Sequence, residues 1–185
     1  MILDIVVDVQ KDFITGALAN PQAQANVAHL AETVKAHARA GHWLFLTRDT
    51  PPDDYLSTRE GRHLPEGRGI EGEGGGNFAP GLENALDGTE PEVCHIVNKP
   101  TFGSYMLPSE ILDELMAHNK AVDDIDKIVI YGYCTDICVI SNAMVLRAAF
   151  PETEIEILSD CCAGVTPQSH QTALDAMRAC QFTIV

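Results

Sequence analysis

Short apolar runs that alternate with segments of helical periodicity are the feature that most constrains the fold of this chain. The runs are almost continuously apolar, which is typical of strands buried on both faces of a parallel sheet. They cover residues 2–7, 43–46, 94–97, 128–131, 155–158 and 182–185. Apolar spacing predicts helices over residues 22–40, 109–118 and 138–149, and Thr166-Pro167, an N-cap residue followed by Pro, predicts a final helix that runs to about residue 180. This order predicts an α/β fold, a three-layer α/β/α sandwich with a six-stranded, mainly parallel sheet.

The length of 185 residues suits one compact domain, so a single domain over residues 1–185 is expected. Residues 50–80 interrupt the alternation, because this stretch is rich in Gly and Pro and poor in apolar residues. A loop of this length within a compact domain is usually a binding loop or a disordered segment. We therefore expect residues 50–80 to form a long active-site loop.

The chain carries 27 acidic and 12 basic residues, for a net charge of -15. Nucleic-acid binding requires Lys and Arg to neutralise phosphates, and an anionic membrane surface would repel this chain. The N-terminal run contains Asp4 and lacks the basic region of a signal peptide. No apolar run approaches the roughly 20 residues that span a bilayer. These patterns indicate a cytoplasmic protein that acts on a small molecule, with no nucleic-acid or membrane partner.

Six cysteines lie at positions 94, 134, 138, 161, 162 and 180. Disulfide frameworks are typical of small secreted chains, and the spacing between Cys134 and Cys138 is not that of a zinc knuckle. Six free thiols are therefore expected. A reactive thiol among them has to be identified by the residues that surround it.

Charged and nucleophilic residues follow the predicted strands. Asp8 follows the first, Arg48 and Asp49 the second and Lys99 the third, while Cys138 comes soon after the fourth. Ligands of open α/β sheets bind beyond the carboxyl ends of the strands, so these side chains are expected to converge.

Cys138 stands at the predicted start of a helix. A helix N-terminus carries a partial positive charge that favours a thiolate, and its free N–H groups can stabilise an oxyanion. Taken singly, each residue has a structural explanation: a core thiol, a turn cap at Asp8, an ion-pair partner at Lys99. Their convergence favours a catalytic set.

The segments around these residues resemble the isochorismatase-like cysteine hydrolase superfamily, which includes nicotinamidases. The similar segments are residues 8–13 (DVQKDF), 47–49 (TRD), 98–100 (NKP), 132–139 (GYCTDICV) and 159–164 (SDCCAG). The resemblance implies that Asp8, Lys99 and Cys138 are catalytic. It also implies a cis peptide between Tyr133 and Cys134, which would direct the backbone N–H groups of Cys134 and Cys138 toward an oxyanion.

The activity that the resemblance implies is hydrolysis of a small amide or related C–N bond. Cys138 would attack the carbonyl and form a thioester acyl-enzyme, with Asp8 as its proton acceptor. Related proteins commonly form homo-oligomers, so self-association is expected as well. Phe13, Tyr105 and Tyr133 are the aromatic residues expected in the substrate pocket, and Arg68 could bind an anionic substrate group.

The sequence departs from nicotinamidases at the residues that would bind a metal. Asp49 is retained, but Thr50-Pro51 replaces the expected histidine motif, and Arg68 stands where a histidine is expected. One carboxylate without imidazoles makes a poor transition-metal site, although His63 and His95 remain possible substitutes. We therefore expect no metal and no other cofactor.

Three other functions stay open at the level of sequence. The first is a metal-dependent nicotinamidase with different ligands, and the second is a catalytically inactive binding member of the fold. The third is a thiol-redox protein that uses Cys134 and Cys138, although the sequence has no Cys-x-x-Cys motif.

Overall fold

The computed structural model of the protein describes residues 1–16, 18–64 and 75–185. Its centre is a six-stranded sheet in the order β3-β2-β1-β4-β5-β6, in which every pair of neighbouring strands is parallel. The strands are β1 (Ile2–Val7), β2 (Trp43–Asp49), β3 (Cys94–Lys99), β4 (Lys127–Tyr133), β5 (Glu154–Ala163) and β6 (Thr183–Ile184). The expected six-stranded α/β fold is confirmed.

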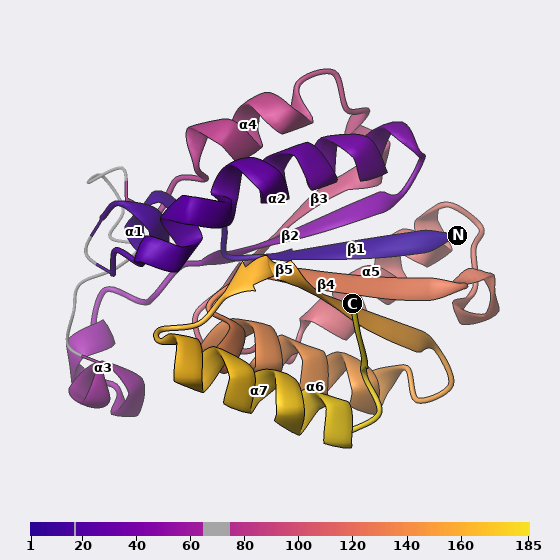
Figure 1. The fold of residues 1–185 in the computed structure, drawn as a ribbon. Coiled ribbons are helices and arrows are strands. Elements are labelled where there is room, and N and C mark those ends of the chain that lie inside the picture. Colours follow the sequence, from indigo (N-terminus) through magenta and orange to yellow (C-terminus); the bar gives the residue numbers. More distant parts are fainter. Residues whose placement is uncertain (17, 65–74) are drawn as a thin grey trace.

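Helices cover both faces of the sheet (Figure 1). They are α1 (Lys11–Ile14), α2 (Pro21–Arg39), α3 (Arg59–His63), α4 (Pro80–Leu86), α5 (Leu107–Ala117), α6 (Ile140–Ala149) and α7 (Pro167–Ala179). Helices α2 and α4 pack together on one face, and α5, α6 and α7 lie on the other. The short helices α1 and α3 lie at the left of Figure 1, on the side where β1 leads into α1.

The strand order reverses between β1 and β4. From β1 the chain adds β2 and β3 on one side, then returns to place β4, β5 and β6 on the other. Right-handed crossovers put the connecting helices of the two halves on opposite faces, which explains the three layers. The crevice at such a reversal, beyond the carboxyl ends of the strands, is the usual ligand site of this architecture.

Side chains cap the starts of α2 and α7. Asn20 caps α2, since its side chain accepts hydrogen bonds from the backbone N–H groups of Gln22 and Ala23. Thr166 caps α7 in the same way, and a proline follows each cap at the first helical position. The start of α7 agrees with the sequence prediction.

The segment that contains Cys138 differs from the predicted start of an α-helix. Residues Thr135–Val139 form a π-helical turn, in which the N–H of Val139 donates to the carbonyl of Cys134, and α6 begins only at Ile140. Cys138 is thus held by a wider turn than expected. Such turns occur often at functional sites.

Two other segments also differ from the sequence prediction. Cys161 and Cys162 lie within β5, beyond the predicted strand of residues 155–158, because β5 resumes pairing with β4 after a shift in register. Within the expected loop of residues 50–80, the structure describes a 3₁₀ turn, Tyr55–Ser57, and helix α3. Arg68, the suggested anion-binding residue, lies outside the described residues.

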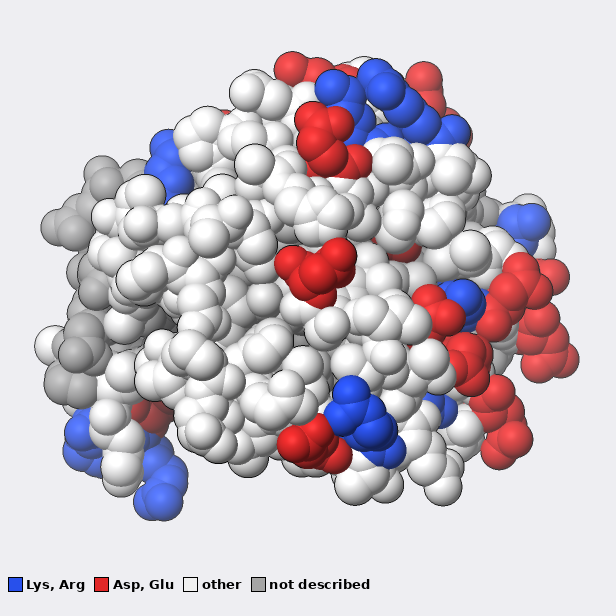
Figure 2. All heavy atoms as spheres, viewed as in Figure 1, with Lys and Arg blue, Asp and Glu red and all other residues white. Residues whose placement is uncertain are grey.

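Acidic side chains gather at the right of Figure 2, where β1 begins, and the middle of the same face carries few charges. No helix in the described part of the chain is long and apolar enough to cross a membrane. Most of the core is apolar, but Asp8, Asp49 and Lys99 are at most 1% exposed. Buried charges are costly unless they pair, so these three residues mark a specialised site.

Candidate active site

Asp8, Lys99 and Cys138 meet at the strand-order reversal. Asp8 follows β1, Lys99 ends β3, and Cys138 lies in the π-helical turn after β4. The Lys99 Nζ lies 2.6 Å from Asp8 Oδ2 and 3.6 Å from the Cys138 sulfur. Three residues that are far apart in the sequence therefore form one buried polar cluster.

The Asp8 carboxylate is fixed by both of its oxygens. The Thr47 hydroxyl donates to Oδ1 at 2.6 Å, while Oδ2 faces the Lys99 ammonium. The backbone of Asp8 has a φ of 49°, a conformation that is uncommon outside glycine, and its N–H donates to Thr47. Lys99 is held in turn by Asp49 at 3.5 Å and by the carbonyl of Thr101 at 3.1 Å.

Burial and charge attraction act in opposite directions within the cluster. Burial raises the pKa of Asp8, against the opposing effect of the Lys99 charge. Burial also opposes the charge on Lys99, but the carboxylates of Asp8 and Asp49 outweigh it and raise the pKa of the ammonium. Lys99 is therefore a cation at neutral pH.

The Cys138 thiol is strongly held in its neutral form. Burial raises its pKa well above the ordinary value, and the charge of Asp8 and a hydrogen bond with it add to this, against the attraction of Lys99. A thiol of this kind is a poor nucleophile by itself. It needs a base close by, and the Asp8 carboxylate is the acidic group whose charge and hydrogen bond act on it most strongly.

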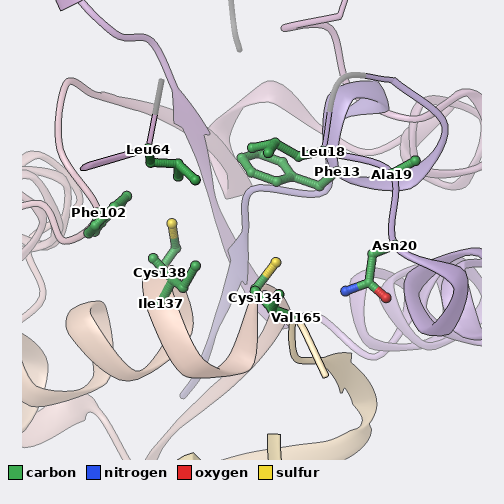
Figure 3. Close-up of a pocket in the computed structure, with 10 residues that line it drawn as sticks. All are labelled: Phe13, Leu18, Ala19, Asn20, Leu64, Phe102, Cys134, Ile137, Cys138 and Val165. Atoms are coloured by element: carbon green, nitrogen blue, oxygen red, sulfur yellow. The ribbon is translucent and has the colours of Figure 1, made fainter. Parts of the chain in front are cut away.

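A cavity of about 300 Å³ opens above the two sulfur atoms of Cys134 and Cys138 (Figure 3). This volume is at the lower end of the range for small-molecule sites. The lining is mainly apolar and comes from α1, from the π-helical turn and from irregular segments between elements: Phe13, Leu18, Ala19, Asn20, Leu64, Phe102, Cys134, Ile137, Cys138 and Val165. The side chain of Asn20 is already engaged as the cap of α2, and it also donates to the carbonyl of Gly164.

The three aromatic residues expected in the pocket are placed differently. Phe13 lines the cavity, but Tyr105 and Tyr133 are not among its lining residues. Tyr133 is fully buried and its hydroxyl donates to Asn26 on α2, away from the cavity. Tyr105 is 79% exposed, so it has solvent rather than the pocket around it.

Several lining residues were not predicted from the sequence. Phe102 and Val165 follow the carboxyl ends of β3 and β5, so their position after a strand could have indicated them. Leu18 and Leu64 had no comparable signal, because they lie in irregular segments whose path depends on tertiary packing.

The backbone between β4 and the π-helical turn has two unusual features. A cis peptide joins Tyr133 and Cys134, as the resemblance implied. Gly132 has a φ of 128°, and a Cβ atom there would lie 2.1 Å from the carbonyl oxygen of Val7. Only glycine allows β4 to pass this close to the end of β1, immediately before Asp8.

The described residues around Asp49 do not fit a transition-metal site. Asp49 faces Lys99, and it belongs to none of the groups of three potential ligands found among the described residues. His63 is exposed on α3, where its ring contacts the carbonyl of Arg59. His95 stacks on Phe45 beside Glu114, on the edge strand. No catalytic step is therefore assigned to a metal.

The family model for the isochorismatase domain matches residues 3–185. The chain belongs to the isochorismatase family. A search of curated proteins found no match. The isochorismatase fold is also shared with solved structures of low sequence identity.

Three of these solved structures are amide hydrolases by name. The nicotinamidase PncA of Bacillus subtilis has 19% identity and a TM-score of 0.83, with 100% of this chain and 98% of that chain covered. The pyrazinamidase/nicotinamidase of Streptococcus mutans has 22% identity and a TM-score of 0.82, with both chains covered completely, at 100%. N-carbamoylsarcosine amidase of Thermoplasma acidophilum has 22% identity and a TM-score of 0.73, with 99% and 94% covered.

Proposed function

We propose that this isochorismatase-family protein is a cysteine-dependent amidohydrolase that cleaves the C–N bond of a small amide through a thioester at Cys138. The observation that carries the proposal is the contact of Asp8, Lys99 and Cys138 beneath an apolar cavity. A buried core thiol needs neither a buried carboxylate nor a buried ammonium beside it. Lys99 contacts both Asp8 and Cys138, so the groups that we propose as proton acceptor, cation and nucleophile of an acyl transfer lie together.

In the proposed reaction Asp8 takes the proton of Cys138 as the sulfur attacks the amide carbonyl. The negative charge moves to the carbonyl oxygen, for which the backbone N–H groups of Cys134 and Cys138 are the proposed donors. The proton on Asp8 then passes to the leaving nitrogen, and the amine departs. Water attacks the thioester as it gives a proton to Asp8, the C–S bond breaks to release the acid, and Asp8 returns the proton to the sulfur, which restores the thiol. Lys99 stays protonated and stabilises the Asp8 carboxylate between these steps.

The cavity supports a substrate whose acyl group is small and largely apolar. Its described walls consist mainly of aliphatic and aromatic side chains, among them Phe13, Leu18 and Phe102. An apolar pocket discriminates by size and by the cost of burying charge. We therefore propose neutral primary amides as the first substrates to examine.

Nicotinamidase activity is a second candidate, favoured by the fold shared with proteins of that name. It uses the same cysteine chemistry, so nicotinamide belongs in the substrate panel. Assays with and without added Zn²⁺ and a chelator would separate metal-dependent from metal-independent hydrolysis.

The test is ammonia release from a panel of amides, including nicotinamide and N-carbamoyl compounds, together with intact-mass analysis after acid quench. We expect turnover of at least one amide and a mass increase equal to its acyl group on Cys138. Cys138→Ala should abolish both signals, whereas Cys180→Ala, at an exposed position after α7, should leave them unchanged.

The proposal fails if hydrolysis survives Cys138→Ala or if no acyl adduct forms during turnover. If none of the amides reacts but the protein binds one of them in the cavity, the catalytically inactive binding member becomes the better description.

A further inference from the structure

A second cluster of polar residues is buried on the face of the sheet that α2 covers, outside the candidate active site. We propose that Asp4, His37 and His42 form a binding site for one divalent transition-metal ion of the Zn²⁺ class. Asp4 lies on β1 four residues before Asp8, or about 13 Å along the strand. The proposed site is therefore separate from the cavity.

The three side chains come from neighbouring elements and point at one another. Asp4 is in β1, His37 is in the last turn of α2, and His42 lies between α2 and β2. The Nδ1 atoms of His37 and His42 lie 2.6 and 2.8 Å from separate oxygens of the Asp4 carboxylate. The three potential ligand atoms all lie within 4.8 Å of one another.

These separations are close to those around a tetrahedral ion. Ligands about 2 Å from one ion lie about 3.3 Å apart, so the two contacts with Asp4 would lengthen by about 0.5–0.7 Å when an ion binds. Imidazole nitrogen combined with carboxylate oxygen is a common donor set for Zn²⁺ and its neighbours in the first transition row.

The buried charge on Asp4 is the second observation. Its side chain is 0% exposed, and among the described residues no Lys or Arg pairs with it. The Nδ1 atoms of His37 and His42 and the Tyr131 hydroxyl contact its two oxygens. A carboxylate buried to this extent requires positive charge beside it. A divalent cation would balance it with both imidazoles neutral.

The surroundings support a metal ligand at Asp4. The Tyr131 hydroxyl donates to Asp4 Oδ2 at 2.6 Å and would hold the carboxylate in position, as outer-shell donors of metal sites do. The side chains of His37 and His42 are 25% and 14% exposed, so an ion can enter from solvent.

One other group of three potential ligands, His29, Asp160 and Cys161, occurs among the described residues. Its His29 and Asp160 side chains are 57% and 68% exposed, and an exposed ion pair needs no metal to balance its charge. It provides a matched control, since His29 and His37 are both α2 histidines paired with an aspartate.

The experiment is titration of the chelator-treated, full-length protein with Zn²⁺ in competition with a chromophoric chelator, and with Co²⁺ monitored by absorption. We expect one bound equivalent that is lost in His37→Gln and in His42→Gln but retained in His29→Gln and in Asp49→Asn. Tyr131→Phe should weaken binding about 10- to 100-fold. Circular dichroism of each variant verifies folding, and the two separate histidine variants keep the test valid if one is unstable.

Several results would overturn the proposal. The wild-type protein could bind no Zn²⁺ under competition, or both His37→Gln and His42→Gln could retain the equivalent. Thiolate-to-Co²⁺ charge-transfer absorption would also contradict it, because the proposed ligands contain no sulfur. Loss of binding in His29→Gln would instead place the ion at the exposed cluster.

Discussion

Asp8 affects Cys138 in two ways that have opposite consequences for reactivity. It is the proposed acceptor of the thiol proton, and its charge and hydrogen bond also raise the pKa of that thiol. The first effect is needed for turnover, and the second holds the thiol neutral at rest. The two effects can be separated by replacing the carboxylate with an amide.

Asp8→Asn should therefore abolish catalysis and yet make Cys138 easier to ionise. We expect turnover to fall by about 10²- to 10⁴-fold, as for loss of a general base. Removal of the negative charge lowers the pKa of Cys138, so iodoacetamide should label it at a lower pH than in the wild type. Quantitative mass spectrometry from pH 6 to about 10 measures this, with the exposed Cys180 as internal reference. Slower labelling of Cys138 in the variant would contradict the assigned electrostatics.

Lys99 also has a structural role, in addition to the catalytic one proposed for it. Its ammonium is the positive partner of both Asp8 and Asp49 in the buried cluster. In Lys99→Met the buried carboxylates of Asp8 and Asp49 lose their cation. Burial and the charge of Asp49 then raise the pKa of Asp8 further above its ordinary value of 3.8. The folded variant then binds a proton that the unfolded chain releases, so its unfolding free energy falls as pH rises through this raised pKa.

We expect Lys99→Met to lose about 3–5 kcal/mol of stability near neutral pH and less near pH 5, as measured by urea unfolding. Lys127→Met is the matched control, because Lys127 pairs with Glu156 in the same sheet but is 33% exposed. That variant should lose at most about 1 kcal/mol. Equal losses for the two lysines would show that burial of the Lys99 pair has no special energetic role.

The proximity of the three residues in the polar cluster could be predicted from the sequence. Asp8, Lys99 and Cys138 follow apolar strands, and parallel strands end at one edge of a sheet, so order in the sequence implied proximity. Tyr105 and Tyr133 were chosen as aromatic residues near the motifs, without information on side-chain direction. A tyrosine at the end of a strand can face either layer, and Tyr133 faces α2.

Among the elements, the junction between β1 and β4 depends most on one residue type. Gly132 lets β4 lie against Val7 with no side chain between them. The same contact sets the distance between Asp8, after β1, and the π-helical turn that holds Cys138.

Gly132→Ala should be far more destabilising than other substitutions at positive φ. Gly41 is the control, since its φ is 84° and a Cβ atom there meets nothing within 4 Å. Gly41→Ala should cost about 1–2 kcal/mol from backbone strain alone. Gly132→Ala adds the clash with Val7, so we expect a larger loss in thermal unfolding and loss of Cys138 acylation. Similar melting temperatures for the two variants would contradict this account.

Strand centres were predicted well and strand ends poorly, for a physical reason. Burial on both faces requires apolar centres, which the sequence displays directly. Strands β2 and β3 end in the polar residues Asp49 and Lys99. These two residues still belong to the sheet because they pair with each other, in register with the rest of the two strands. The π-helical turn before α6 had no local signal, because it is set by packing between β4 and α7.

For the whole molecule, the net charge of -15 is a source of self-repulsion. Salt screens like charges over about 10 Å at 0.1 M, so added NaCl should stabilise the folded state near neutral pH. We expect the melting temperature to rise between low salt and about 0.3 M NaCl at pH 7.5, with a smaller rise near the sequence pI of about 4.6. A melting temperature that falls with salt at pH 7.5 would mean that attractive surface pairs dominate.

The polar cluster and the cavity wall are carried by different parts of the fold, and this affects how substrate specificity can change. Asp8 and Lys99 are anchored to strands, whereas Leu18, Leu64 and Val165 come from connecting segments. Substitutions in those segments can reshape the cavity while leaving the hydrogen bonds of the sheet intact. A library at the three wall positions should therefore yield mostly folded variants with altered substrate range, which makes this scaffold a practical starting point for directed evolution.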